Sequence, residues 1–394
     1  MSANTRAERN SLLVMALAGF SSMVSMRMCD PMLVVLSQEF QVSTGEASQV
    51  VSAFAVAYGV LQLFYGPLGD RFGKLRVITL AAMACAVFSA LTSMASNLTM
   101  LVFMRALMGA AAAGIIPLTL AWIGDQVAYD RRQETLARLM GATVSGMMVG
   151  LWFGGFAAEN LGWRTAFAVV SVLFTTAAVL LLSKLHSMPA PKPTAASASG
   201  LLASFGNTFK LLGNTRVRQV LTVTVVEGAL VFGAMAFIPT HLHVQFDMSV
   251  VFAGTVMMLY GVGGLIYSQL ARRWLGWLGG ERGLVRTGAS FIVLGLLTLA
   301  WTHQPVLGMV GCFATGFGFY MMHNTLQTQA TQMAPHARGT AVTLFACMLF
   351  FGQSAGVLVM ALSVDHGWLP LAFSLCALGV AGLGWRIHRL VGQH

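Results

Sequence analysis

Charged side chains are scarce in this sequence. Lys, Arg, Asp and Glu make up 9% of its 394 residues, whereas hydrophobic residues make up 57% and the mean hydropathy is +0.75. In a soluble domain about a quarter of the residues are charged, so too few are present here to cover a water-exposed surface. This scarcity excludes an ordinary soluble protein and predicts a chain that lies mostly within a membrane.

Three further absences narrow the class of protein. The five cysteines fall inside predicted spans without the spacing of a metal site, so we expect small packing residues. Gly73-Lys74 is not part of a phosphate-binding loop, because Leu68 stands where such a loop needs glycine and Leu75 where it needs Ser or Thr. No nucleophile–base set lies on adjacent spans. We therefore expect no enzyme activity, ATP hydrolysis, metal or cofactor.

Long apolar segments dominate what is present. A helix that crosses a bilayer needs about 20 mostly apolar residues. The sequence predicts twelve such helices and an all-α membrane protein, with spans near 12–37, 47–67, 76–95, 98–124, 137–158, 164–183, 217–240, 250–271, 285–302, 306–331, 339–362 and 368–388. No cleavable N-terminal signal is evident, because the first run is long and carries Arg27 and Asp30.

The twelve spans fall into two groups of six. Between them, Lys184–Arg216 contains three prolines and an Ala/Ser run, which is typical of a linker. The sequence allows two structures for this segment, a short surface helix near 201–212 or a disordered tether. The predicted organisation is a first bundle at 1–184, a cytoplasmic linker at 185–216 and a second bundle at 217–394.

The basic residues indicate how the chain is oriented. The net charge is +10, but these residues lie between apolar runs, which favours membrane topology over nucleic-acid binding. With both termini in the cytoplasm, 20 of the 23 Lys and Arg fall in cytoplasmic positions: Arg6, Arg9, Arg71, Lys74, Arg76, Arg131, Arg132, Arg138, Lys184, Lys192, Lys210, Arg216, Arg218, Arg272, Arg273, Arg282, Arg286, Arg338, Arg386 and Arg389. Arg164 falls outside, and Arg27 and Arg105 fall within helices.

The two groups of six also echo each other. A similar pair of segments lies at the fifth to sixth helix of each group. In the first group the segments are Gly150–Gly154 and Gly162–Phe167, and in the second they are Gly352–Gly356 and Gly367–Phe373. Two parallel repeats of six helices would produce such an echo.

A charged turn separates the second and third spans. Four ionic side chains within 70–76 cannot lie in hydrocarbon, so the turn is expected at a membrane surface. Its residues match the pattern G-x-L-x-D-R-x-G-K/R-x-R at Gly66, Leu68, Asp70, Arg71, Gly73, Lys74 and Arg76. In this the chain resembles the major facilitator superfamily, and within it the drug–proton antiporters.

The resemblance implies a fold and a set of roles. It implies two six-helix bundles with pseudo-two-fold symmetry, and a central cavity lined by the first, fourth, seventh and tenth helices. It also implies that the 66–76 turn is a conformational gate that docks on the second half in one state. Asp125, at the end of the fourth helix, is a further expected partner for the basic residues of this gate.

Four charged residues lie inside predicted spans, where charge is costly and usually faces a water-filled pathway. Arg27 and Asp30 are three residues apart, so they share a helix face and are expected to pair, either as a structural brace or as cavity groups. Pro31 predicts a kink beside them. Glu227 is the buried acid expected in the second half, as a proton carrier or as a helix-to-helix hydrogen-bond partner.

Arg105 begins the run Arg105-Ala-Leu-Met-Gly109, and the resemblance associates such an R-x-x-x-G element with proton coupling in antiporters. A guanidinium keeps its charge and favours the ionised form of a nearby carboxyl group. A helix-packing anchor is the alternative. Many drug–proton antiporters carry the motif G-P-x-x-G-G on the fifth helix. This sequence has Gly150-Leu-Trp-Phe-Gly154-Gly155 there, which keeps the glycines of the motif but lacks its proline.

The tenth span is unusually polar for a lipid-facing helix. One stripe at helical spacing must face inward, and with the resemblance it predicts substrate contacts at Tyr320, His323, Asn324 and Gln327. Tyr260 and Tyr267 of the eighth span form a similar stripe, which we expect to pack at a gate or rim.

Together these features predict a secondary transporter, and not an enzyme, that moves a small organic solute by alternating access. We expect proton-coupled efflux, with Asp30, Glu227 and Arg105 in proton coupling and Arg27, Asp30 and Glu227 also in substrate binding. A proton symporter that imports an organic anion, and a receptor or scaffold that does not transport, are the alternatives. The expected partners are the substrate, protons and the lipid bilayer, with no nucleic acid, for a monomer in the bacterial inner membrane.

Overall fold

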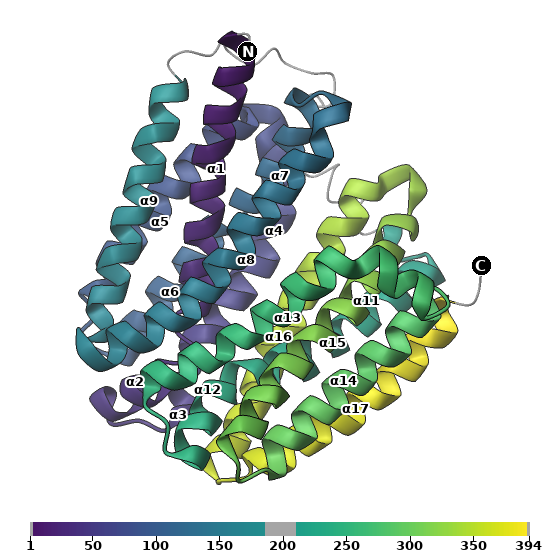
Figure 1. The fold of residues 1–394 in the computed structure, drawn as a ribbon. Helices are drawn as coiled ribbons and strands as arrows, with labels where there is room; N and C mark the ends of the chain where they lie inside the picture. Colours follow the sequence, from purple (N-terminus) through teal and green to yellow (C-terminus); the bar gives the residue numbers. More distant parts are fainter. Residues whose placement is uncertain (1–2, 186–209, 392–394) are drawn as a thin grey trace.

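Nearly all described residues of this chain are helical (Figure 1). The structure is a computed structural model that describes residues 3–185 and 210–391. Its helices are α1 (Ala3–Arg27), α2 (Leu33–Phe40), α3 (Thr44–Ala47), α4 (Gln49–Phe72), α5 (Lys74–Ser93), α6 (Leu98–Ala112), α7 (Ile115–Gln126), α8 (Tyr129–Asn160), α9 (Trp163–Leu185), α11 (Thr215–Glu227), the π-helical segment η2 (Gly228–Phe232), α12 (Gly233–Phe246), α13 (Val250–Trp277), α14 (Glu281–Trp301), α15 (Pro305–Gln332), the 3-10 segment η3 (Pro335–Ala337), α16 (Arg338–Asp365) and α17 (Leu369–Val391).

Eleven helices in the described ranges are long and apolar enough to cross a bilayer. The remaining predicted span, 12–37, is divided between α1 and α2, and its apolar helical part is only Ser11–Arg27. The first predicted span is therefore not one regular helix, and the kink expected at Pro31 lies within this interruption. Residues 186–209, which hold most of the predicted linker and surface helix, lie outside the described residues, so the boundaries 1–184, 185–216 and 217–394 stay predictions.

The two halves of the chain repeat one helix contact. On α8, a Cβ at Gly150 would lie 2.7 Å from Val24 O, and one at Gly154 would lie 2.0 Å from Met28 O. On α16, Gly352 and Gly356 approach Val225 O and Ala229 O in the same way, at 2.1 and 2.2 Å. Glycine permits backbones to pack this closely, and any side chain would force the helices apart. The sequence echo between 150–154 and 352–356 therefore corresponds to equivalent packing of α8 on α1 and of α16 on α11 and η2.

We call the side on which α1 begins and α17 ends the terminal side, and the opposite side the far side. On the far side the two halves are in contact. The Asp365 carboxylate accepts hydrogen bonds from Ser43 Oγ and Gly45 N, both at 2.7 Å, and Glu159 accepts one from Val251 N at 2.8 Å. Carboxylates at the first turns of α3 and α13 thus join one half to the other.

Closer to the middle of the molecule, α4 packs on α16 and α8 packs on α13. The Tyr58 and Phe350 ring centroids are 4.6 Å apart, and a Cβ at Gly59 would lie 2.9 Å from Phe350 Cβ. Likewise, a Cβ at Gly254 would lie 2.5 Å from Leu151 O. Toward the terminal side the halves diverge in Figure 1. The molecule is therefore closed on its far side by contacts between the halves.

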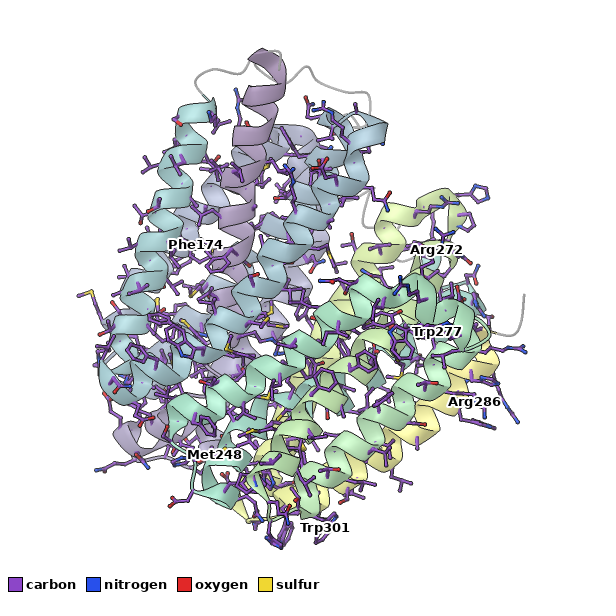
Figure 2. All side chains as sticks on the ribbon, viewed as in Figure 1. Phe174, Met248, Arg272, Trp277, Arg286 and Trp301 are labelled. Carbon is purple, nitrogen blue, oxygen red and sulfur yellow. The ribbon has the colours of Figure 1, made fainter. Side chains whose placement is uncertain are left out.

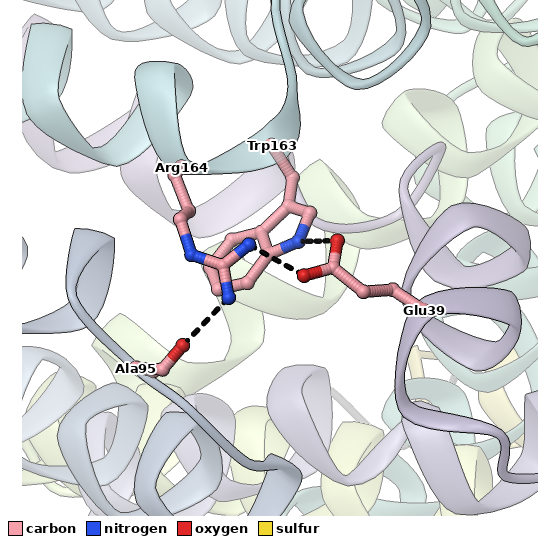
Figure 3. Close-up of polar contacts among 4 residues, drawn as sticks. All are labelled: Glu39, Ala95, Trp163 and Arg164. Carbon is pink, nitrogen blue, oxygen red and sulfur yellow. Dashed lines mark hydrogen bonds and ion pairs between the residues drawn. The ribbon is translucent and has the colours of Figure 1, made fainter.

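A second far-side cluster holds the first half together (Figure 3). Glu39, in α2, accepts hydrogen bonds from Trp163 Nε1 and Arg164 Nη1 at the start of α9. Arg164 also donates to Ala95 O at 2.9 Å and lies 4.3 Å from the centre of the Trp163 ring. Arg164, the basic residue that falls outside the expected positive set, is thus neutralised by an ion pair.

Candidate functional site

The break in the first span places two charged side chains inside the molecule. α1 ends at Arg27, and Asp30 N donates to Arg27 O at 3.3 Å in the turn that follows. Pro31 has no backbone N–H to continue the helix. Arg27 Nη1 lies 3.4 Å from Asp30 Oδ2, and the two side chains are 3% and 0% exposed. The predicted Arg27–Asp30 pair is confirmed. The Arg27 guanidinium also lies 4.7 Å from the centre of the Phe232 ring, which belongs to the other half.

The first span of the second half is interrupted at nearly the same depth. α11 ends at Glu227, and the π-helical segment η2 begins at Gly228. A Cβ at Gly228 would lie 2.2 Å from Leu349 O of α16. Glu227 Oε2 lies 2.9 Å from His323 Nδ1 of α15, and Glu227 is 0% exposed. π-Helical turns are rare and frequently occur at functional sites.

The shared packing contacts show how the two interruptions correspond. Val24 and Val225 face equivalent glycines on α8 and α16, as do Met28 and Ala229. Arg27 therefore occupies the position equivalent to Gly228, one residue from the position equivalent to Glu227. Both halves carry their buried charge where the first helix departs from regular α-helical geometry.

Aromatic rings connect these two charged pairs. Phe232, which lies beside Arg27, is 5.0 Å from Phe319 between ring centroids, and Phe319 stacks on His323 at 4.8 Å. Tyr260 of α13 packs on Phe319 at 5.8 Å. We call Arg27, Asp30, Glu227, Phe232, Tyr260, Phe319, Tyr320 and His323 the central cluster. It draws its residues from both halves, at the interface where they meet.

Three polar atoms of the central cluster are buried without a hydrogen-bond partner. They are Asp30 Oδ1, Glu227 Oε1 and the Tyr260 hydroxyl. Such an atom costs about 1–3 kcal/mol, and more when it is charged. Asp30 and Glu227 are the buried acids among the described residues. A proton or a polar ligand that reached these oxygens would remove this cost.

Arg105 is also buried, but its hydrogen bonds lie within the first half. Its Nε donates to Val50 O at 3.1 Å and its Nη1 to Ser25 O at 3.0 Å, and the guanidinium lies 4.2 Å from the centre of the Phe54 ring. These contacts connect α6 with α1 and α4. Arg105 does not hydrogen-bond to Asp30, although the two charges interact electrostatically. The structure thus gives Arg105 the contacts of a packing anchor beside the Arg27–Asp30 pair.

The four residues of the polar stripe on α15 do not all lie in the central cluster. Tyr320 and His323 belong to the central cluster, whereas Asn324 is half-buried outside it. Gln327, one turn closer to the terminal side, is exposed. The structure therefore places His323 against Glu227 and Tyr320 beside Tyr260, and it places the other two predicted contacts nearer the terminal side.

Sequence reasoning missed three members of the central cluster, which are Tyr260, Phe232 and Phe319. Tyr260 was expected to pack at a rim, yet it is fully buried between Phe319 and Tyr320. Phe232 carried no signal, because the chain contains 25 phenylalanines and most lipid-facing positions accept one. A signal for Tyr260 was present in the sequence. The hydroxyl group of a tyrosine within a span favours a polar partner inside the protein over a position against lipid.

The predicted gate lies on the terminal side, between α4 and α5. Asp70 Oδ1 lies 3.5 Å from Lys74 Nζ, and Lys74 also forms an ion pair with Asp125 at the end of α7. The expected pairing of Lys74 with Asp70 and of Asp125 with a basic gate residue is confirmed. Gly73 has φ +91°, a backbone conformation that strongly favours glycine.

Within the described ranges, no hydrogen bond or ion pair joins the gate to the second half. Arg71 lies 5.3 Å from the ring of its neighbour Phe72, and Arg76 and Asp70 are exposed. A Cβ at Gly66 would meet no atom within 4 Å. The gate is thus undocked in this arrangement, and its docked state stays a prediction.

Comparison with known proteins identifies the fold family. The sequence profile of the Major Facilitator Superfamily matches residues 15–357. The chain belongs to this family. It is 26% identical over 389 residues to an uncharacterized transporter, YgaY, of Escherichia coli O157:H7, and the alignment covers 96% of both chains. This major facilitator protein is therefore a multi-pass membrane transporter and not an enzyme.

Two further comparisons agree with this assignment. Multidrug resistance protein D of Escherichia coli (strain K12) is 29% identical over 206 residues, which covers 51% of this chain and 50% of that protein. A crystal structure of the nucleoside transporter NupG superposes with a TM-score of 0.80 at 13% identity, covering 96% of this chain and 99% of the other. At this identity the structural match shows the shared major facilitator fold alone.

The gate supplies a first prediction. We expect Asp70→Ala to slow transport severalfold while expression stays close to wild type, because the change removes a charge from the gate but no buried contact. Initial transport rates in proteoliposomes, normalised to the amount of reconstituted protein, measure the effect. Glu134→Ala, which removes an exposed α8 carboxylate paired with Arg138, is the matched control and should transport normally. Wild-type rates for Asp70→Ala would contradict the gate role.

Proposed function

We propose that this major facilitator protein exports a small organic compound from the cytoplasm in exchange for protons. Asp30 and Glu227 of the central cluster carry the proton. Arg27, Asp30, Glu227, Tyr320 and His323 contact the substrate, and Asn324 and Gln327 line its route from the terminal side. Arg105 holds the Arg27–Asp30 turn in place. The protein works as a monomer, without a cofactor or nucleic acid.

The direction rests on assigning the terminal side to the cytoplasm. Twenty of the 23 Lys and Arg fall on that side in the predicted topology, and cytoplasmic loops carry an excess of such residues. The far-side exception, Arg164, is paired with Glu39. With this assignment the far-side contacts close the molecule to the outside, and the arrangement is the one that receives substrate from the cytoplasm of a bacterial inner membrane.

The unpartnered oxygens of Asp30 and Glu227 carry the proposal. Each acid has one oxygen engaged, by Arg27 or by His323, and one without a hydrogen bond. A buried carboxylate in this state can lower its free energy by binding a proton or by binding a polar substrate group. If both events use the same oxygen, they exclude one another. Mutual exclusion of proton and substrate is what exchange in opposite directions requires.

Several relatives are uncharacterized transporters, and one relative supports export. Multidrug resistance protein D matches about half of this chain, and its name describes resistance to several drugs. The aromatic rings of the central cluster would give a small organic compound apolar surfaces beside the charged groups.

A second candidate is the import of an organic anion together with protons. The Arg27–Asp30 separation of 3.4 Å favours it, because this pair is loose and a substrate carboxylate could replace Asp30 on the guanidinium. Arg27 would then bind the substrate while Glu227 and His323 carry the proton.

The direction of proton movement separates these candidates. Purified protein is first screened by thermal shift against organic cations, anions and neutral compounds, because a bound ligand raises stability by mass action. The ligands found are then tested in proteoliposomes with an imposed pH gradient and a pH-sensitive dye. Export against inward proton flow is expected. Substrate and protons moving together would establish the import reading, and ligand binding without gradient-dependent movement would indicate a receptor.

A further inference from the structure

A groove on the outer surface of the second half lies far from the central cluster in the fold. It has a volume of about 1020 Å³ and runs between α14 and α17 at their terminal-side ends. α14 begins at Glu281 and α17 ends at Val391, so the helix ends place the mouth of the groove at the boundary between membrane and water. Figure 2 shows Arg286 projecting outward from this edge of the molecule. We call it the α14–α17 groove.

The mouth of the α14–α17 groove is strongly basic. Arg282, Arg286 and Arg389 line it, together with His388, and no Asp or Glu is among its lining residues. The nearest acid along the chain, Glu281, instead accepts a hydrogen bond from Gln329 of α15 at 2.9 Å. Three guanidinium groups without a neutralising acid form a site for an anion.

Two contacts set the arrangement of these groups. The Arg389 guanidinium lies 3.8 Å from the centre of the Trp385 ring, which holds it at the mouth of the groove. His388 Nδ1 lies 3.4 Å from Arg282 O and so connects α17 to α14. Trp385 is 57% exposed, as expected for a tryptophan at the membrane boundary.

Below its basic mouth the groove is apolar. Ala289, Val293, Leu294 and Ala381 line this part, and Leu294 is 61% exposed to the surroundings of the protein. A Cβ at Gly384 would lie 2.5 Å from Ala289 Cβ, so small residues bring the two helices together and form the floor. From Arg286 to Leu294 the helix rises about 12 Å, enough to follow the upper part of an acyl chain.

We propose that the α14–α17 groove binds one anionic phospholipid. Arg286 and Arg389 contact the phosphodiester and its headgroup, and an acyl chain lies along Val293, Leu294 and Ala381. A molecule with a negative head and an apolar tail matches a groove that is basic at its mouth and apolar below it. A zwitterionic lipid fits less well, because the groove offers no acid to its ammonium group. Basic pockets between membrane helices on the cytoplasmic side are known to hold such headgroups.

Native mass spectrometry of the purified full-length protein tests this proposal. The protein is incubated with phosphatidylglycerol or with phosphatidylcholine of identical acyl chains. We expect one phosphatidylglycerol to stay bound under conditions that remove phosphatidylcholine. Arg286→Gln/Arg389→Gln should lower the affinity for this lipid by about tenfold or more, because each basic residue near the surface contributes to the attraction.

A matched variant controls for net charge. Arg272→Gln/Arg273→Gln removes two exposed arginines from the terminal end of α13, outside the groove, and should retain the lipid. The single variants Arg286→Gln and Arg389→Gln give intermediate losses and keep the test informative if the double variant does not fold. Soluble glycerol phosphate in excess separates lipid from free phosphate binding, and it should not displace the lipid. Equal retention of the two lipids, or equal loss in both double variants, would overturn the proposal.

Discussion

Glu227→Gln is expected to abolish proton-driven transport. Glutamine has the shape of glutamate and can still hydrogen-bond His323, but it cannot take up or release a proton. Substrate movement driven by an imposed pH gradient should fall by at least about 100-fold. The measurement is substrate flux in proteoliposomes at equal protein content.

The fold of this variant should be intact. The change replaces a fully buried acid with a neutral amide of nearly the same shape, so the melting temperature should equal or exceed that of the wild type. Glu46→Gln, which neutralises an exposed acid on the far side, is the control and should transport normally. Gradient-driven transport above about half of the wild-type rate in Glu227→Gln would remove Glu227 from the proton pathway.

The Arg27–Asp30 pair gives the second large effect. Arg27→Gln leaves the fully buried Asp30 carboxylate without its counter-ion, and breaking a buried pair in this way costs about 3–5 kcal/mol. We expect a marked drop in melting temperature for this variant. Arg27→Gln/Asp30→Asn removes both charges together, so its stability should return to near that of the wild type.

Transport by the double variant decides between a brace and a functional pair. If the pair takes part in substrate or proton binding, Arg27→Gln/Asp30→Asn is stable but inactive. A double variant that is both stable and active would show that the pair only braces the turn between α1 and α2. Glu134→Gln/Arg138→Gln, which neutralises an exposed pair on α8, is the control and should change stability by less than about 0.5 kcal/mol.

Much of the fold could be predicted because lipid restricts the choice of structure. Apolar runs of about 20 residues must be helices. The number of crossings is supported by the basic residues, because they fall on one side of the membrane only when the spans are counted correctly. The first span was the exception. The predicted span covers 12–37, but Pro31 and the pairing of Arg27 with Asp30 favour a turn over a regular helix within it. Periodicity alone does not show which of these local effects prevails.

The candidate site was predictable only in part. Buried charges are rare enough in a span to be noticed singly, so Arg27, Asp30, Arg105 and Glu227 stand out. Their partners depend on how separate helices pack. The sequence shows that Glu227 and His323 are polar, but 96 positions separate them and only the packing of α11 on α15 brings them within 2.9 Å.

The same limit applies to the aromatic part of the cluster. Phe232 and Phe319 are ordinary apolar residues in the sequence, and they become part of the site because the π-helical segment and α15 meet beside Arg27. Arg105 shows the converse. It was noticed for its charge, yet its hydrogen bonds go to backbone carbonyls of two neighbouring helices.

The Asp365 carboxylate has a consequence for any separation of the two halves on the far side. It binds Gly45 N and Ser43 Oγ at the start of a helix that belongs to the opposite half. There is no room for a side chain at position 45, because a Cβ would lie 2.4 Å from Asp365 Oδ2. Separation of the halves at this point would break both hydrogen bonds and so remove a helix cap, a contribution of about 1 kcal/mol.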